Sequence, residues 1–191
     1  MNNPTETVFG NPNTFAIRYV PGYTYANSNF IYAYCHLVLG GQLIGVRDEP
    51  CVVTTRSAHL ERIKERLKHN FESIVHEEFN NRNDEELFEL VCKSNRMEEQ
   101  HSPAFAHLPV LENKVWQNCC ITFDETTDAW LIAMVAQNGR VKFLWEGWRE
   151  PCPQEQINKL YSVVVDRRFV VDVMERCLSV IEKEYRNYPV V

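Results

Sequence analysis

The sequence lacks a long apolar run and an apolar N-terminal leader. Its longest unbroken apolar stretch is residues 129–136, whereas a helix that spans a membrane needs about 20 apolar residues. The N-terminus is polar and has no cationic start followed by an apolar segment, so no secretory signal peptide is expected. Together these absences predict a cytoplasmic protein without a membrane span.

Regular cysteine spacing is also missing. The chain has seven cysteines, an odd number, and no Cys-x-x-Cys pair. Zinc ribbons, thioredoxin-like redox pairs and a complete disulfide framework all need more regular patterns. We therefore expect reduced, mostly buried thiols, as is usual in a reducing compartment.

Motifs for nucleotide binding and catalysis are absent. There is no Gly-x-x-x-x-Gly-Lys, no Gly-x-Gly-x-x-Gly and no Gly-x-Ser-x-Gly, the patterns of phosphate-binding loops and of serine hydrolases. No two histidines stand four apart with an acid between them, as in zinc hydrolases. We expect no catalytic residue, cofactor or metal site. The alternative is an enzyme whose site is assembled from scattered residues, for which His36, His101 and Cys120 are the candidates.

What the chain does have is an uneven negative charge. The net charge is −6, from 26 acidic and 20 basic residues. Residues 72–99 alone contain nine acidic residues and three basic ones, a local excess equal to the charge of the whole chain. Such a field repels nucleic acid and attracts basic partners. For any single carboxylate, the alternative is a solvated helix face.

The order of predicted elements is strands, helices, a meander, a strand and a helix. Hairpins are expected at Gly40–Gly41 and at Asn138–Gly139, because these turns need positive φ angles. Asn83 and Glu86 have the spacing of a capping box at the start of the second helix. The predicted strands are residues 14–20, 29–39, 42–46, 115–123, 129–136, 140–145 and 160–165. The predicted helices are residues 56–79, 83–91 and 166–186.

This order predicts the fold class. Strands and helices do not alternate throughout, which argues against a doubly wound parallel sheet. We expect an α+β protein with a largely antiparallel sheet of about six strands and helices packed on one face. The 191 residues suit a single domain, in which residues 1–13 form a loose lead-in.

Two N-terminal stretches and the C-terminal end resemble a known family. Residues 8–17 and 30–45, followed much later by a strand at 160–165 and a helix at 166–186, are similar to the immunity protein 42 family of bacterial polymorphic toxin systems. The matching motif residues are Gly10, Pro12, Phe15, Gly41 and Gly45, and all of them are interpreted as scaffold. Asn11 stands where the family usually has an acidic residue.

The resemblance implies a binding protein with no chemistry of its own. Members neutralise a cognate toxin domain in the cytoplasm of the producing cell, and many such toxins are nucleases with basic clefts. The acidic region derived above suits a partner of this kind, because complementary charge speeds encounter. A regulatory adaptor with the same fold is a further alternative. The identity of the toxin and the oligomeric state are left open.

The candidate partner-binding residues follow from charge and aromatic character. Trp, Tyr and Arg are enriched at interfaces, so an exposed aromatic residue is expected beside the acids, although core packing is the alternative for each ring. Tyr23 is expected in a loop, and Trp148 at the end of the meander. The candidates are Glu77, Glu78, Asp84, Glu85, Glu86, Glu89, Glu98, Glu99, Tyr23 and Trp148.

Overall fold

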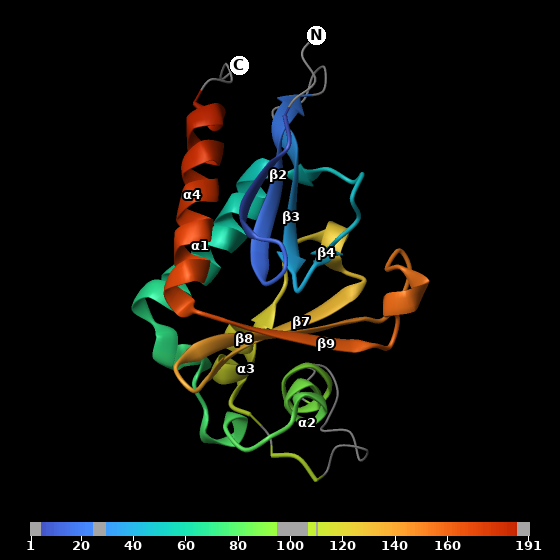
Figure 1. Ribbon diagram of the computed structural model, residues 1–191, viewed down its shortest axis with the longest axis vertical. Coiled ribbons are helices and arrows are strands. Elements are labelled where there is room, and N and C mark those ends of the chain that lie inside the picture. Colours follow the sequence, from blue (N-terminus) through green and yellow to red (C-terminus); the bar gives the residue numbers. More distant parts are fainter. Residues whose placement is uncertain (1–4, 25–29, 95–106, 110, 187–191) are drawn as a thin grey trace. The chain divides into compact units, whose positions relative to one another are not determined.

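The computed structural model describes residues 5–24, 30–94, 107–109 and 111–186, and the chain divides into two compact units (Figure 1). Unit 1 contains the described residues of Met1–His69, Phe123–Asp128 and Asp166–Val191. Unit 2 contains those of Asn70–Thr122 and Ala129–Val165. The fold is α+β, as the sequence predicts, and the single-domain interpretation stays a prediction. No helix within the described part of the chain is long and apolar enough to cross a membrane.

Unit 1 contains a five-stranded antiparallel sheet. Its path runs β1-β2-β3-β4, and β5 also pairs with β3. The predicted turn at Gly40 and Gly41, with φ of 54° and 87°, joins β3 to β4. The strands are β1 (Thr7–Asn11), β2 (Phe15–Thr24), β3 (Ile31–Leu39), β4 (Gln42–Ile44) and β5 (Cys51–Val52).

Strand β1 corrects the prediction of a loose lead-in over residues 1–13, which was wrong for residues 7–11. Phe9 is buried in this strand, which pairs with β2 along its whole length. A tight turn returns the chain into β2, and Gly10 makes the close approach possible. Its φ is 99°, and a Cβ there would lie 2.5 Å from the Phe15 carbonyl oxygen, so only glycine fits without a backbone shift.

Strand β2 also runs further than predicted. Pro21 and Gly22 were expected to end the strand at Val20, yet β2 continues to Thr24 across a register shift between Val20 and Tyr23. Proline lacks the N–H that a regular ladder needs, and such an irregularity accommodates it. Tyr23, predicted in a loop, is therefore a strand residue.

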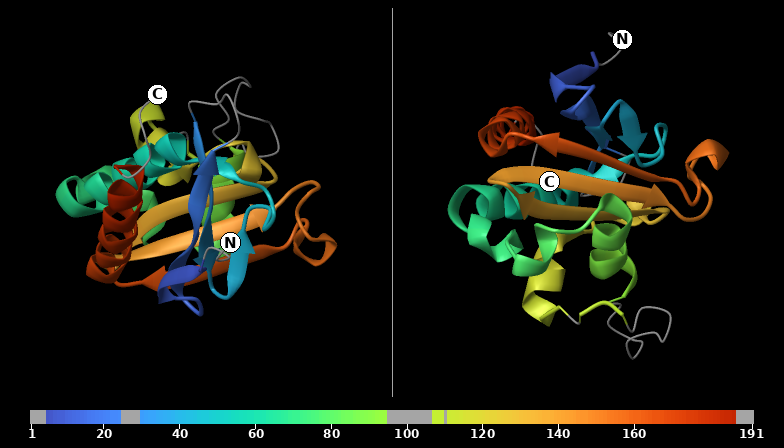
Figure 2. Two further views of the ribbon diagram at one scale, coloured as in Figure 1. Left: turned by 90° about the horizontal axis from the view of Figure 1, so that it is seen from above. Right: turned by 60° about the horizontal axis from the view of Figure 1, so that its bottom comes forward.

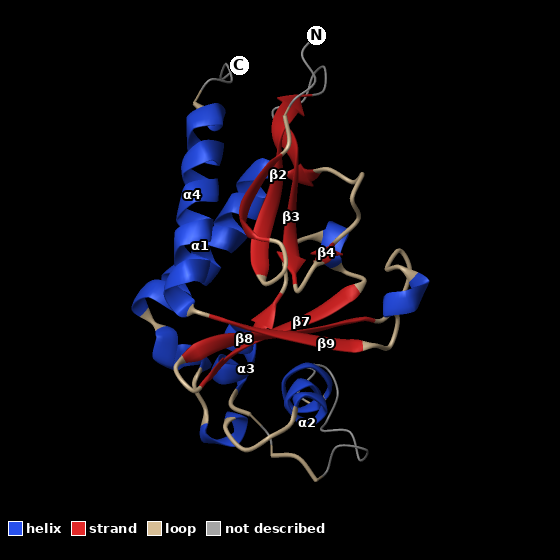
Figure 3. Ribbon diagram, in the orientation of Figure 1, coloured by secondary structure: helices blue, strands red, loops and turns tan. Residues whose placement is uncertain are grey.

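Two long helices cover one face of this sheet. Helices α1 (Val53–His69) and α4 (Arg167–Tyr185) lie side by side against β2 and β3 (Figures 1 and 3). Asp166 caps α4 by accepting hydrogen bonds from the backbone N–H groups of Arg168 and Phe169, as the sequence suggested. The core between helices and sheet is apolar. It includes Phe15, Ile17, Leu37, Leu39, Leu60, Leu67, Val173 and Met174.

Unit 2 contains a separate four-stranded antiparallel sheet in the order β6-β7-β8-β9. The single predicted sheet is thus two sheets. Asn138 and Gly139, with φ of 52° and 74°, make the predicted turn between β7 and β8. The strands are β6 (Cys120–Ile121), β7 (Trp130–Gln137), β8 (Arg140–Gly147) and β9 (Leu160–Val165).

Short helices lie on one face of the unit 2 sheet, as Figures 1 and 2 show for α2 and α3. The α-helical segments are α2 (Asp84–Phe88), which continues as the π-helix η3 (Glu89–Lys93), and α3 (Asn113–Cys119). The 3₁₀ turns are η1 (Phe71–Ile74), η2 (Glu77–Phe79) and η6 (Gln154–Gln156), with η5 (Glu125–Thr127) in unit 1.

Two further predicted elements differ in the structure. The predicted helix 56–79 ends at His69, because Asn70 leaves helical geometry with φ of −142° and ψ of 46°; the apolar stripe continues as the 3₁₀ turns that bury Ile74 and Phe79. The predicted strand 115–123 is mostly helix α3. Its apolar residues, such as Val115 and Cys119, are also spaced four apart, and short apolar runs do not separate the two periods.

Candidate functional site

The predicted acids that the structure describes all lie on η2, α2 and η3 of unit 2. Asp84 is engaged within the unit: its carboxylate accepts hydrogen bonds from Lys142 Nζ on β8 and Ser162 Oγ on β9. Burial by itself raises the pKa of Asp84, but these two hydrogen bonds outweigh it and the pKa is lowered. Asp84 therefore fastens α2 to the sheet.

Two further acids have local structural roles. Glu78 forms an ion pair with Arg82, four residues on. Glu86 completes the predicted capping box: its backbone N–H donates to Asn83 Oδ1 at 2.9 Å, and its Oε2 accepts from the Asn83 N–H at 3.3 Å. The box satisfies N–H groups at the start of α2 that would otherwise lack partners.

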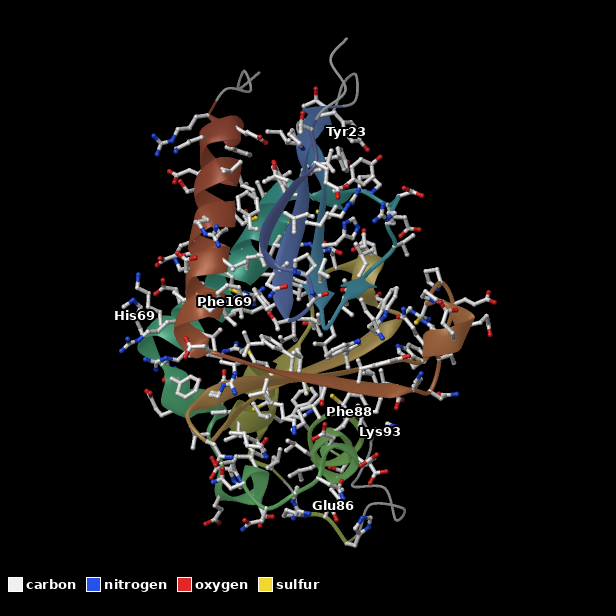
Figure 4. The ribbon with its side chains drawn as sticks, in the orientation of Figure 1. Tyr23, His69, Glu86, Phe88, Lys93 and Phe169 are labelled. Atoms are coloured by element: carbon white, nitrogen blue, oxygen red, sulfur yellow. The ribbon has the colours of Figure 1, made fainter. Side chains whose placement is uncertain are left out.

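The remaining carboxylates are open to solvent. Glu77 and Glu85 are exposed, Glu89 is partly exposed, and no ion pair among the described residues involves any of them. Glu86 lies on the side of α2 that faces away from the sheet, opposite to Phe88 (Figure 4). We call the three open residues Glu77, Glu85 and Glu89 the acidic segment. The other two predicted acids, Glu98 and Glu99, lie outside the described residues.

Tyr23 belongs to a group of three tyrosines in unit 1. Its ring stacks on Tyr32 with centroids 6.1 Å apart and lies 6.3 Å from the ring of Tyr34. Tyr32 and Tyr34 alternate along β3, so they share a face, and Tyr23 is the register partner of Tyr32. All three rings are partly exposed. Tyr32 and Tyr34 were not among the predicted partner-binding residues, although their Tyr-x-Tyr spacing on a predicted strand was the available signal.

Trp148 follows β8 in unit 2 and is 41% exposed. The guanidinium of Arg149 lies 4.4 Å from its ring centroid, a cation–π contact between two exposed side chains. Trp148 and the acidic segment belong to unit 2, whereas the three tyrosines belong to unit 1.

Of the three candidates for a motif-less enzyme site, the two that the structure describes, His36 and Cys120, make contacts within the fold. His36 is 2% exposed; its Nε2 bonds to the Val46 carbonyl at 2.8 Å and its Nδ1 to Arg18 Nη1 at 3.3 Å. Burial lowers the pKa of His36 to about 4, so the ring is neutral at pH 7. Cys120 Sγ lies 3.6 Å from the Val91 carbonyl oxygen. His101 falls outside the described residues. Within the described part of the chain, no group of three or more His, Cys, Asp or Glu side chains could hold a metal ion.

A buried ion pair in unit 1 was also not predicted from the sequence. Arg56 is 2% exposed, and its Nη2 donates to Asp124 Oδ1 at 2.8 Å and to Thr126 Oγ1 at 2.7 Å. Its guanidinium also lies 4.6 Å from the ring centroid of Phe123. Arg56 thus anchors the segment Phe123–Asp128 to α1. Nothing in the spacing of Arg56 on its helix distinguishes it from the solvated bases nearby.

Comparison with known proteins identifies the family. The model of the family described as immunity protein 42 matches residues 7–180. The chain belongs to the immunity protein 42 family. A similar solved structure is described as the crystal structure of CdiI from Burkholderia dolosa AUO158, with a TM-score of 0.61 and 16% sequence identity. The alignment covers 91% of this chain and 99% of that one, which supports a shared fold. A search of curated proteins found no match.

Proposed function

We propose that this immunity protein 42 family member binds a cognate bacterial toxin domain in the cytoplasm and neutralises it without chemistry of its own. The observation that carries the proposal is the family match over residues 7–180. The open carboxylates of the acidic segment support an electrostatically steered encounter with a basic active-site or substrate-binding surface, such as that of a nuclease. The tyrosine group and Trp148 supply rigid aromatic contact area of the kind that dominates interfaces.

The first test is complex formation with the product of the gene immediately upstream, which the proposal expects to carry the toxin domain. The two proteins are co-expressed, and a stable one-to-one complex that abolishes toxicity is expected. A neighbouring domain that is toxic, well expressed and neither bound nor neutralised would remove the basis of the proposal.

The second test isolates the acidic segment. The triple variant Glu77→Gln, Glu85→Gln and Glu89→Gln is compared with a control that neutralises Glu49, Glu125 and Glu155, three exposed acids elsewhere. Both variants change the net charge equally. At low salt, the association rate should fall several-fold for the first variant and much less for the second, since local charge steers docking. Equal effects would show that only the overall charge matters.

A further inference from the structure

A pocket of 470 Å³ lies between the two long helices of unit 1. It is formed by the N-terminal half of α1 and the C-terminal half of α4, which pack along each other. Its base is apolar: Val53 and Ile181 are buried and Leu178 is partly buried. Pockets that hold ligands or anchoring side chains are typically about 300–1,000 Å³ and mostly apolar, so this one has a functional size.

The rim of the pocket is acidic and aromatic. Glu61 comes from α1 and Glu182 from α4, with exposed side-chain fractions of 48% and 65%. Tyr185, 44% exposed, stands beside them at the end of α4. Glu61 pairs with Lys64, whose side chain is 13% exposed, and Glu182 pairs with Arg186, which is 75% exposed at the C-terminal cap of α4. The Glu182–Arg186 pair is exposed on both sides and therefore weak, so the Glu182 carboxylate is available to a stronger cationic partner. Glu61, itself 48% exposed, supplies a second carboxylate at the rim.

This combination of groups defines the chemistry of an occupant. An apolar base with a negative rim suits a side chain that has an aliphatic stem and a cationic head, because the stem is buried while the head reaches the carboxylates. Tyr185 adds an aromatic face for a cation. The same rim disfavours phosphates and acidic side chains, since like charges repel at close range.

Resting on the proposed function, we propose that the α1–α4 pocket receives an arginine or lysine side chain of the toxin domain and anchors the complex. A cation held in a pocket acts after encounter, so it slows dissociation, whereas open surface carboxylates mainly speed association. The pocket and the acidic segment therefore have separable kinetic effects.

The test compares two variants that differ only in position along the same helices. In Glu61→Gln/Glu182→Gln the rim loses its charge. In the control, Glu65→Gln/Glu175→Gln, one carboxylate is removed from α1 and one from α4 outside the pocket, and these pair with Lys64 and Lys68. Binding is measured by biolayer interferometry on the toxin domain recovered in the first test of the proposed function. The dissociation rate should rise about tenfold or more for the rim variant and less than about twofold for the control.

A second variant, Ala58→Trp, fills the pocket from its exposed side without changing charge. It should also raise the dissociation rate, with far-UV circular dichroism confirming the native fold. If the wild type binds, and both Glu61→Gln/Glu182→Gln and Ala58→Trp dissociate at the wild-type rate, the pocket inference is overturned while the immunity function stands. If the wild type itself does not bind the toxin domain, both proposals fail together.

Discussion

At the scale of single residues, the clearest determinants of stability are buried polar side chains. Arg56 and Asp124 form an ion pair with side-chain exposures of 2% and 9%, and His36 is buried as a neutral ring between Arg18 and the Val46 carbonyl. Each of these side chains bonds to a partner distant in sequence. Removing one member leaves the other buried without compensation, which is costly.

The ion pair predicts a large loss of stability in Arg56→Met. We expect the free energy of unfolding to fall by about 3–5 kcal/mol, since Asp124 would stay buried without its cation. Urea denaturation measures the change, and Arg62→Met, an exposed position on the same helix, should cost less than about 0.5 kcal/mol. Similar losses in both variants would mean that the pair contributes no more than a surface residue.

His36 predicts a pH dependence with a defined sign. Burial lowers its pKa from 6.5 to about 4 in the folded state, so the unfolded chain binds the proton more readily between these values. Stability is therefore lost as the pH falls through this window, by up to about 3 kcal/mol. In His36→Gln this loss should disappear from the unfolding free energies measured at several pH values. His69→Gln, at an exposed position, serves as the control, and an unchanged slope in His36→Gln would contradict the assignment.

At the scale of elements, α2 shows how a short helix is fixed. Five residues are too few for a helix to be stable alone, and the capping box at its start and the Asp84 contacts to β8 and β9 supply what length does not. The acids on and around α2 thus divide into Asp84 and Glu86, which stabilise the helix, and those of the acidic segment, which are open to a partner.

The capping box gives the first element-scale prediction. Asn83→Ala removes the side-chain oxygen that accepts the Glu86 N–H and should cost about 1 kcal/mol of stability. The matched control is Asn81→Ala, an exposed asparagine just before the helix, for which thermal unfolding should show little change. A larger effect at Asn81 would place the helix start elsewhere.

Asp84 and Glu85 are neighbouring acids for which opposite effects on stability and on toxin association are expected. Asp84→Asn should lower stability by about 1 kcal/mol, a modest amount because the pair with Lys142 is partly exposed, and should leave toxin association unchanged. This stability difference should vanish as the pH falls through the lowered pKa of Asp84. Glu85→Gln should do the reverse, slowing association with no loss of stability. Urea denaturation and association kinetics separate the two outcomes.

At the scale of the whole molecule, the chain passes repeatedly between two compact units. Unit 1 takes in a middle segment and the C-terminal helix, so neither unit is one continuous stretch of sequence. Discontinuous units of this kind are expected to depend on each other for stability.

Two spectroscopic probes test this expectation. All four tryptophans, at positions 116, 130, 145 and 148, belong to unit 2, whereas the two longest helices belong to unit 1. Tryptophan fluorescence and the circular dichroism of helices therefore report on different units. A single domain predicts coincident transitions in urea, as for two-state unfolding. Separate midpoints would show that the units unfold as distinct domains.

Much of the fold followed from the sequence by itself. Hairpins at Gly40–Gly41 and Asn138–Gly139, the last strand and the last helix were predicted because turn chemistry and hydrophobic period are local properties. So was the capping box of Asn83 and Glu86. The family resemblance, carried by short motifs near the two ends, was confirmed by the match over residues 7–180.

The tertiary structure decided what depends on contacts distant in the sequence. Residues 115–119 read equally as strand or helix, and packing in unit 2 selects the helix. Arg56 is buried against Asp124, 68 positions away, and Asp84 bonds to Lys142, 58 positions away. The division into two sheets also depends on which strands pair. Sequence periodicity describes which face of an element is apolar, but it does not say which other element covers that face, and the pocket between α1 and α4 depends on that choice.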